Sequence, residues 1–494
     1  MTTIDPASAP QDAEELKPPA AVKVLYGIGH MHEGGFNVAI GFAFFYYTAV
    51  LGLSGSLVGA ALFIGLCFDA GVDPFIGSWS DNIRSKWGRR VPLMLVGAPV
   101  MALALAGLFS PPPGLAEPLL FAWLLAMAIT LRVAMSLFHV PYVALGAELA
   151  TGYAERSSVV AYRTVASVLT AVVVTALAYS VFFAGEGGLQ RPERYPGFGM
   201  ATGVLIFIGM VVCSLGVRRY AATLPHGVQA TRPLLRRLPG EVAEIFRNRS
   251  FRILFCSAVV VYTAIGLHTT LNTHVNVFVW KLQPSMIQTL AYIYLAGLMA
   301  GVPIAPMLSR RMEKKVVVVI GMSMVIVVWA LPPILRALGL FTATGAEAVP
   351  LLAIAMAFAG MGSGFAAIAY PSMMADAVDE HEHLFAHRRE GLYFAGLGFA
   401  FKGSVGIGLL LAGLVLDLLQ FPKEAGRQVG AVLPEDLLIR LVLTAGVGSA
   451  ILAAISMAMM LPYAISRRRH DEISSGLRAR RLEAAETAAA AAVR

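Results

Sequence analysis

Apolar runs of about 20 residues, the length of helix that crosses the hydrocarbon core of a bilayer, recur along almost the whole chain. These runs lack the polar faces that helices of a soluble protein need. Only 14% of the residues are charged, against about 25% in ordinary soluble proteins. The chain is therefore expected to be a polytopic α-helical membrane protein, which excludes a soluble enzyme, a disordered chain and a nucleic-acid-binding module.

Charged breaks and Pro- or Gly-rich breaks divide the apolar runs into twelve predicted spans. They cover residues 24–52, 56–79, 91–110, 117–150, 158–185 and 199–217 in the first half, and 252–280, 286–308, 315–337, 349–375, 391–420 and 437–466 in the second. The runs are too long and too apolar for barrel strands. The sequence thus predicts an all-α integral membrane fold with 12 transmembrane helices in two six-helix halves.

A long polar segment separates the two halves. The expected organisation is a cytoplasmic N-terminal tail (1–23), a six-helix bundle (24–217), a cytoplasmic connecting loop (218–251), a second six-helix bundle (252–466) and a cytoplasmic C-terminal tail (467–494). Six plus six spans with a long connector is the pattern of major facilitator transporters, whose halves rock about a site near the bilayer midplane.

Lys and Arg are concentrated in the termini and in the loops after the even-numbered spans. Cytoplasmic loops carry such an excess. Both termini are therefore expected in the cytoplasm, and the chain is expected in the inner (plasma) membrane. The same excess explains the net charge of +8, so no nucleic-acid partner is expected.

Ionisable side chains inside the spans are functional candidates, because a charge at mid-bilayer costs on the order of 3 kcal/mol or more. Asp69 and Asp73 are four residues apart and share one face of the second span. Two neighbouring carboxylates repel unless they share a cation, a proton or a basic partner. We expect the pair to couple transport to a cation; the alternative is a pair near the cytoplasmic mouth that loop water solvates.

Two other spans supply groups that could act with this acidic pair. Lys402 in span eleven is the expected counter-charge, unless its side chain snorkels to an interface. His139 in span four lies seven residues after Arg132, so the two share a face. Histidine changes its charge between about pH 5 and 8, which suits a proton-linked transporter. The alternative for His139 is a neutral ring that bonds to a neighbouring helix.

Further polar side chains could line a substrate path. Glu33 lies among glycines near the start of span one, where it either hydrogen-bonds substrate hydroxyls or faces cytoplasmic water. His268, Asn272 and Asn276 step by four along span seven and form one polar stripe. Such a stripe lines a cavity or bonds to a neighbouring helix. Glu148 lies at the cytoplasmic end of span four and is expected to be a gate or loop partner.

Several short motifs are spread over both halves. They comprise Asp69, Asp73, Pro74, Gly77, Ser80, Asp81, Arg84, Gly88, Arg89, Arg90 and Pro92 in and after span two; Tyr26 and Gly29 in span one; His139, Pro141 and Tyr142 in span four; Met374, Asp376, Asp379, Glu380, Arg388, Arg389, Glu390, Gly391 and Tyr393 after span ten; and Lys402. Together they resemble the motifs of the glycoside–pentoside–hexuronide:cation symporters of the major facilitator superfamily.

This resemblance implies a symporter in which the span-two acids bind the coupling cation, which is H⁺, Na⁺ or Li⁺. The cation-coupling residues would then be Asp69, Asp73, His139 and Lys402. The resemblance also places Arg163 near a sugar, and the expected substrate-binding residues are Glu33, Arg132, Tyr142, Arg163, His268 and Asn272. A cytoplasmic gate of salt bridges is expected from Asp81, Arg84, Arg89, Arg90, Glu148, Asp376, Asp379, Arg388 and Arg389, although part of this charge signals topology alone.

The chain also departs from the family's pattern. His139 replaces the span-four acid, Val72 replaces a polar amide and Ser136 stands for a threonine. The lost oxygens leave a poor cage for Na⁺, so H⁺ coupling is predicted, with Na⁺ at Asp69 and Asp73 as the alternative. Val143 stands where the family has an aromatic side chain that stacks on a sugar. A lysolipid or other amphiphile is therefore a second candidate substrate.

The predicted function is cation symport of a glycoside, uronide or similar small hydroxylated solute by alternating access. The protein is expected to act as a monomer whose other partner is the lipid bilayer. No cofactor is expected besides the coupling ion. The sequence shows no nucleophile–base pair, metal-ligand spacing or phosphate loop, so enzyme activity is not expected. Import and export both remain open.

Overall fold

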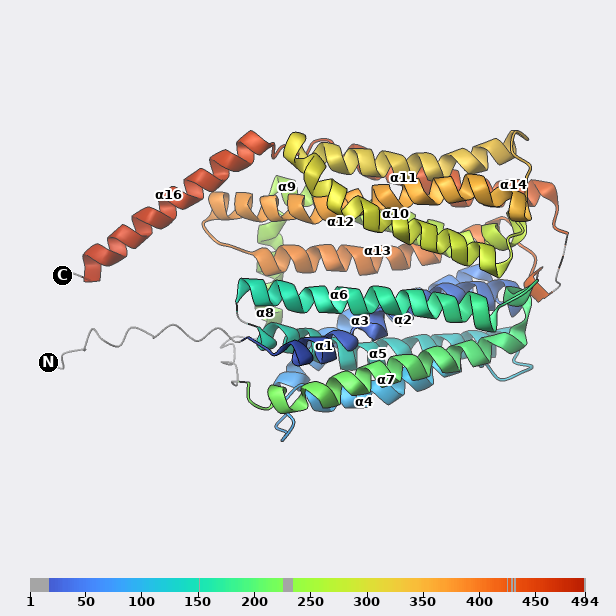
Figure 1. The fold of residues 1–494 in the computed structure, drawn as a ribbon, viewed down its shortest axis with the longest axis horizontal. Coiled ribbons are helices and arrows are strands. Elements are labelled where there is room, and N and C mark those ends of the chain that lie inside the picture. Colours follow the sequence, from blue (N-terminus) through green and yellow to red (C-terminus); the bar gives the residue numbers. More distant parts are fainter. Residues whose placement is uncertain are drawn as a thin grey trace. The chain divides into compact units, whose positions relative to one another are not determined.

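The computed structural model describes residues 17–150, 152–224, 234–423, 425–427, 430 and 432–492. Helices make up the regular structure of this described part (Figure 1). The chain forms two compact units. The first comprises Met1–Tyr47, Ile64–Ala184 and Arg191–Val228, and the second comprises Thr48–Phe63, Gly185–Gln190 and Gln229–Arg494.

The long helices follow the predicted spans closely. The first part of the chain contains α1 (Ala20–Ile28), α2 (Met31–Phe45), α3 (Gly55–Asn82), α4 (Val91–Leu108), α5 (Glu117–Leu149), α6 (Tyr153–Ala176) and α7 (Tyr195–Ala221). The later part contains α8 (Leu234–Ile245), α9 (Arg249–His274), α10 (Pro284–Arg311), α11 (Lys314–Ala337), α12 (Val349–Phe385), α13 (Glu390–Leu418), α14 (Glu435–Leu443), α15 (Ser449–Met460) and α16 (Arg467–Ala492).

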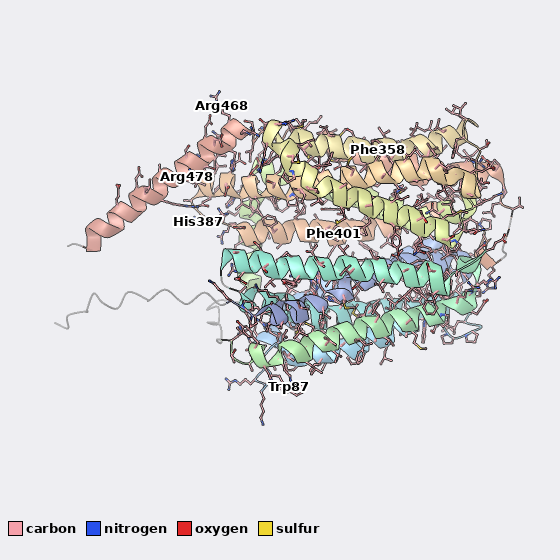
Figure 2. The ribbon with its side chains drawn as sticks, in the orientation of Figure 1. Trp87, Phe358, His387, Phe401, Arg468 and Arg478 are labelled. Atoms are coloured by element: carbon pink, nitrogen blue, oxygen red, sulfur yellow. The ribbon has the colours of Figure 1, made fainter. Side chains whose placement is uncertain are left out.

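Eleven helices of the described chain are long and apolar enough to cross a membrane. Their outward faces carry large apolar side chains, which water would solvate poorly and lipid solvates well. Leu103 is 72% exposed, and Phe358 and Phe401 on α12 and α13 are about half exposed (Figure 2). These features confirm the predicted all-helical membrane fold.

The first predicted span, 24–52, is broken, and it is the expected span that has no counterpart among these eleven helices. α1 ends at Ile28 and α2 begins at Met31. Between them the amides of Gly29 and His30 donate to the carbonyls three residues back, as in a 3₁₀ turn. Gly29 lies so close to Tyr142 and Cys213 that a Cβ there would be 2.6 Å from both side chains. The break thus lies at a close approach of α5 and α7 to the chain.

The start of α3 packs within the second unit, although the end of α3 belongs to the first. Asp417 near the end of α13 accepts hydrogen bonds from the backbone amides of Gly55 and Ser56, at 2.8 and 2.9 Å, and from the Ser54 hydroxyl at 2.8 Å. A carboxylate is well suited to the positive end of the helix dipole. This grouping differs from the predicted boundaries at 217 and 252, which stay predictions.

Small residues let helices of the second unit pack at backbone distance. Along the contact between α10 and α12, Gly297 faces Ala357 and Gly301 faces Met361 and Gly364. In lipid the hydrophobic effect does not drive helix association, and close approach of this kind supplies van der Waals packing in its place.

Replacing Gly301 with Val should therefore destabilise the second unit, because the new Cβ would collide with the Met361 carbonyl oxygen. We expect the free energy of unfolding to fall by about 1–3 kcal/mol, measured as a lower melting temperature in detergent. Gly398→Val is the matched control, since a Cβ at Gly398 meets no atom within 4 Å. Equal melting temperatures for the two variants would contradict this packing.

Candidate functional site

The first unit holds a buried carboxylate at the predicted coupling position. Asp69 on α3 is only 4% exposed. The hydroxyl of Ser136 donates a 2.8 Å hydrogen bond to its Oδ1 atom, and Arg132 Nη1 lies 3.9 Å from its Oδ2 atom. Arg132 and Ser136 are one turn apart on α5, so this helix turns both groups towards α3. The negative charge of Asp69 is therefore balanced within the unit.

The rest of the predicted acidic pair is less enclosed. Asp73, one turn after Asp69, is partly buried, and Pro74 follows it inside α3. The guanidinium of Arg132 also lies over the Phe36 ring of α2, 4.9 Å from the ring centroid. The charge of Arg132 is thus held between a carboxylate and an aromatic face.

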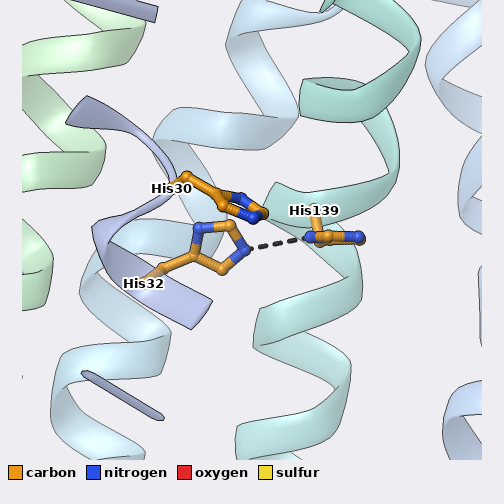
Figure 3. A group of neighbouring side chains, drawn as sticks. All are labelled: His30, His32 and His139. Carbon is orange, nitrogen blue, oxygen red and sulfur yellow. Dashed lines mark hydrogen bonds between the residues drawn. The ribbon is translucent and has the colours of Figure 1, made fainter. Parts of the chain in front are cut away.

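Three histidines come together beside this region. His30 and His32, at the start of α2, meet His139 of α5, and one ring nitrogen from each lies within 4.8 Å of the others (Figure 3). His32 Nε2 is 3.1 Å from His139 Nδ1. His30 Nε2 lies 3.1 Å from a carboxylate oxygen of Glu33. This is a group of the described residues that could hold a metal ion.

An aromatic pair lies beside the histidines, with the Tyr142 ring centroid 5.8 Å from those of His30 and His32. Tyr26 and Tyr142 stack with their ring centroids 4.4 Å apart. Each hydroxyl donates a 3.0 Å hydrogen bond to the backbone carbonyl of the other residue. The Arg163 guanidinium lies 5.3 Å from the centroid of the Tyr142 ring. Tyr142 is fully buried, and its contact with a substrate stays a prediction.

The predicted gate residues of the first unit form one ion-pair cluster. A single Glu148 oxygen accepts hydrogen bonds from Arg89 and Arg90, both at 2.8 Å. The buried Arg90 also pairs with Asp81 at 2.6 Å. Arg84 is exposed. The structure therefore brings four of these five residues together at the loop between α3 and α4.

The predicted gate residues of the second unit also form ion pairs, with partners that the sequence did not identify. Lys314 donates to both oxygens of Asp376 at 2.7 Å. Arg388 pairs with Asp379, Glu382 and Glu390. Although partial burial opposes its charge, these acceptors raise the pKa of Arg388 above its ordinary value. Each of these ion pairs of predicted gate residues therefore joins two residues of the same unit.

Ion pairs to Arg389, the residue after Arg388, attach helix α8 to the second unit. Arg389 pairs with Glu241 at 3.1 Å and with Glu244 at 3.3 Å. Glu244 also lies 3.3 Å from His381. Burial works to raise the pKa of Glu244, but the hydrogen bonds and charges of Arg389 and His381 lower it below its ordinary value. The connecting segment between the predicted bundles thus contains a helix that ion pairs hold to the second unit.

The remaining predicted site residues lie in the second unit. His268 on α9 bonds to the Ala445 carbonyl at 3.0 Å and stacks on Trp329 with ring centroids 4.2 Å apart. Asn272 and Lys402 are partly buried, on α9 and α13. The contacts of His268 are those of a packed side chain. Its substrate role, that of Asn272 and the pairing of Lys402 with the α3 acids stay predictions.

Sequence reasoning missed two parts of the site. Arg132 and Ser136 are partners of Asp69, and their spacing of four on α5 was the available signal. Of the three histidines only His139 was a predicted site residue, and the His-x-His pattern at 30 and 32 was the local sign of a cluster. The third member is 107 residues away, so the fold alone brings it there.

Long apolar helices in two units and a buried, charge-balanced carboxylate define a membrane transporter. The sequence matches the family described as MFS/sugar transport protein over residues 25–467. The chain belongs to this family, which confirms the predicted major facilitator fold and the symporter resemblance.

Curated relatives are similar over most of their length. They include an uncharacterized symporter of Synechocystis sp. (25% identical, covering 93% of this chain and 96% of the relative). An isoprimeverose transporter of Lactiplantibacillus pentosus is 23% identical over 77% of this chain and 76% of the relative. A glucuronide carrier protein homolog of Escherichia coli is 25% identical, with 80% and 83% covered.

Solved structures share the fold at low sequence identity. The nucleoside transporter NupG superimposes with a TM-score of 0.54 at 17% identity, covering 89% of this chain and 98% of that one. A bacterial homolog of the human lysosomal transporter Spinster gives a TM-score of 0.59 at 12% identity, covering 90% and 98%.

The Glu148 cluster can be tested by comparing two carboxylates. Glu148→Gln should cost about 1.5–3 kcal/mol of stability, because two arginines lose a charged acceptor and Arg90 is buried. Asp81→Asn should cost about 0–1 kcal/mol, because the Asp81 side chain is 54% exposed. Melting temperatures of the two purified variants measure the difference; a larger loss for Asp81→Asn would contradict the assignment.

Proposed function

We propose that the protein is a proton-coupled symporter of a glycoside, uronide or similar small hydroxylated solute. It would act as a monomer in the inner membrane, with both termini in the cytoplasm and without enzyme activity. The observation that carries the proposal is the buried Asp69 carboxylate, bonded to Ser136 and paired with Arg132. The names of the isoprimeverose transporter and the glucuronide carrier homolog support this substrate class.

The surroundings of Asp69 favour H⁺ over Na⁺ as the coupling ion. Hard cations such as Na⁺ are held by several oxygen ligands, as carboxylate and carbonyl cages show for Ca²⁺. The partners of Asp69 include the Ser136 hydroxyl and the Arg132 guanidinium. A proton needs only one carboxylate oxygen as its site, whereas a hard metal cation needs several oxygen ligands. Na⁺ coupling at Asp69 and Asp73 is the alternative that the experiment below distinguishes.

Protonation of Asp69 supplies a coupling mechanism. When the carboxylate is neutral, Arg132 loses its ion pair with Asp69, and a further anion would stabilise its charge in the membrane. A uronide carboxylate meets that need, since guanidinium groups bind carboxylates through paired hydrogen bonds. Arg163, over the Tyr142 ring, offers a second guanidinium in the same unit. Proton binding and substrate binding thereby favour each other.

The ion pairs of the basic loops would complete the cycle as a cytoplasmic gate. Glu148 with its arginines, and Asp376 with Lys314, hold the ends of neighbouring helices together within each unit. Rocking of two rigid halves needs such internal ties, because each half must move as one body. Part of this charge also serves topology.

The coupling ion is tested by uptake into membrane vesicles under an imposed H⁺ gradient and, separately, an imposed Na⁺ gradient. The labelled panel contains glycosides, uronates and a lysolipid. We expect a glycoside or uronate to accumulate with the H⁺ gradient alone, and Asp69→Asn to abolish accumulation. Asp471→Asn, an exposed carboxylate on α16, is the matched control. Accumulation driven by Na⁺ would refute H⁺ coupling, and accumulation of the lysolipid alone would refute the sugar assignment.

The role of Arg132 is tested by comparing charged and neutral substrates. Arg132→Gln should weaken uronate binding about 10- to 100-fold, the loss expected for a hydrogen bond to a charged group. Binding of a neutral glycoside should change much less. Competition against a labelled substrate measures both affinities. Equal losses for the two solutes would show that Arg132 acts only through Asp69.

A further inference from the structure

The histidine cluster contains a buried ring nitrogen that no hydrogen bond within the described chain satisfies. His30 Nδ1 is buried and has no hydrogen-bond partner within the described part of the chain. Its side chain is 12% exposed, and His32 is fully buried. Buried polar atoms are nearly always satisfied, so an orphaned imidazole nitrogen beside two other imidazoles needs an explanation.

The other nitrogens of the two α2 rings are already held by acceptors. His30 Nε2 lies 3.1 Å from a Glu33 carboxylate oxygen, to which its N–H donates. His32 Nδ1 lies 2.6 Å from the Gly29 carbonyl and donates to it. Each bond places the ring proton on the bonded nitrogen and leaves a lone pair on the other, His30 Nδ1 and His32 Nε2.

This arrangement is typical of metal-binding histidines. Such residues donate their second N–H to a carboxylate or backbone carbonyl, which orients the ring and strengthens the ligand. Here Glu33 and Gly29 supply one acceptor of each kind. We propose that His30, His32 and His139 form a binding site for a divalent first-row transition metal ion of the Zn²⁺, Co²⁺ and Ni²⁺ class.

The distances are compatible with that class of ion. Zn–N bonds of 2.0–2.1 Å in a tetrahedral site place ligand nitrogens about 3.4 Å apart. His32 Nε2 and His139 Nδ1 are 3.1 Å apart, and all three ligand atoms lie within 4.8 Å. Without the metal, His139 Nδ1 donates a hydrogen bond to His32 Nε2. Metal binding would replace this bond and move the His139 proton to Nε2, and small rotations of the rings would bring the three nitrogens to bonding distance. Imidazole nitrogens select these metals over Mg²⁺ and Ca²⁺, which prefer oxygen.

The site would tie the broken first helix to α5. Two ligands lie where the chain passes from α1 to α2, and the third lies on α5, all within the first unit. Three protein ligands leave a fourth position open for water or another small ligand. This inference rests on the histidine geometry and does not depend on the substrate or coupling ion proposed above.

Metal binding is measured on the purified full-length protein, with the affinity tag removed and adventitious metal chelated. Titration with Co²⁺ should show one equivalent bound, with the visible absorption of a nitrogen-ligated ion. Zn²⁺ should displace it and raise the melting temperature, since a ligand that binds only the folded state stabilises that state. These readouts do not require transport activity.

Variants separate this site from surface histidines. His32→Gln and His139→Gln should each abolish the stoichiometric Co²⁺ signal, and the exposed His387→Gln should retain it (Figure 2). Glu33→Gln should keep one equivalent but weaken binding about 10-fold or more, as loss of an orienting partner does. The melting temperature of each metal-free variant shows whether it is folded.

Three outcomes would overturn the proposal. The first is the absence of saturable binding to the wild-type protein, in which case the three rings share protons only. The second is equal loss of binding in His387→Gln, and the third is retention of full binding in both folded variants of His32 and His139.

Discussion

A charged or polar side chain surrounded by hydrocarbon has no water to hydrogen-bond to, so its partner must come from the protein. Much of the polar chemistry of this chain follows from that constraint. Asp69 is buried with a hydroxyl and a guanidinium from the facing helix. Arg132 lies between that carboxylate and an aromatic ring. Each charge is stabilised by its neighbour, so a change of charge at Asp69 or Arg132 leaves the other without compensation unless its contacts rearrange.

The same constraint explains which parts of the fold the sequence could predict. Hydropathy measures the need to avoid water, and it placed the helices well: residues 91–110, 117–150 and 315–337 were predicted for α4, α5 and α11. It placed helix ends poorly where a helix continues past the apolar run. α12 extends to Phe385, ten residues beyond the predicted end at 375. Ion pairs of Asp376 and Asp379 stabilise this polar end of the helix, which therefore carries no hydropathy signal.

The candidate site was predictable only along single helices. Spacing identified Asp69 and Asp73 as a pair, since one helix carries both. Which face of α5 meets α3, and hence which residues neutralise Asp69, depends on packing between helices that no local pattern records. The histidine cluster illustrates the same limit, because two members adjoin the break in the first span and the third comes from α5. Averaged hydropathy across 24–52 also could not reveal that break.

The broken first helix has a consequence for how the chain enters the membrane. α1 has 9 residues, too few to cross a bilayer alone, whereas α2 has 15 and continues into the π-helical turn Tyr46–Val50. The insertion machinery reads apolar length and composition in the nascent chain, and it therefore meets residues 24–52 as one segment. The residues that crowd the break, Tyr142 and Cys213, are synthesised much later. The contacts that crowd the bend can therefore form only when α5 and α7 arrive beside a segment that has already been inserted.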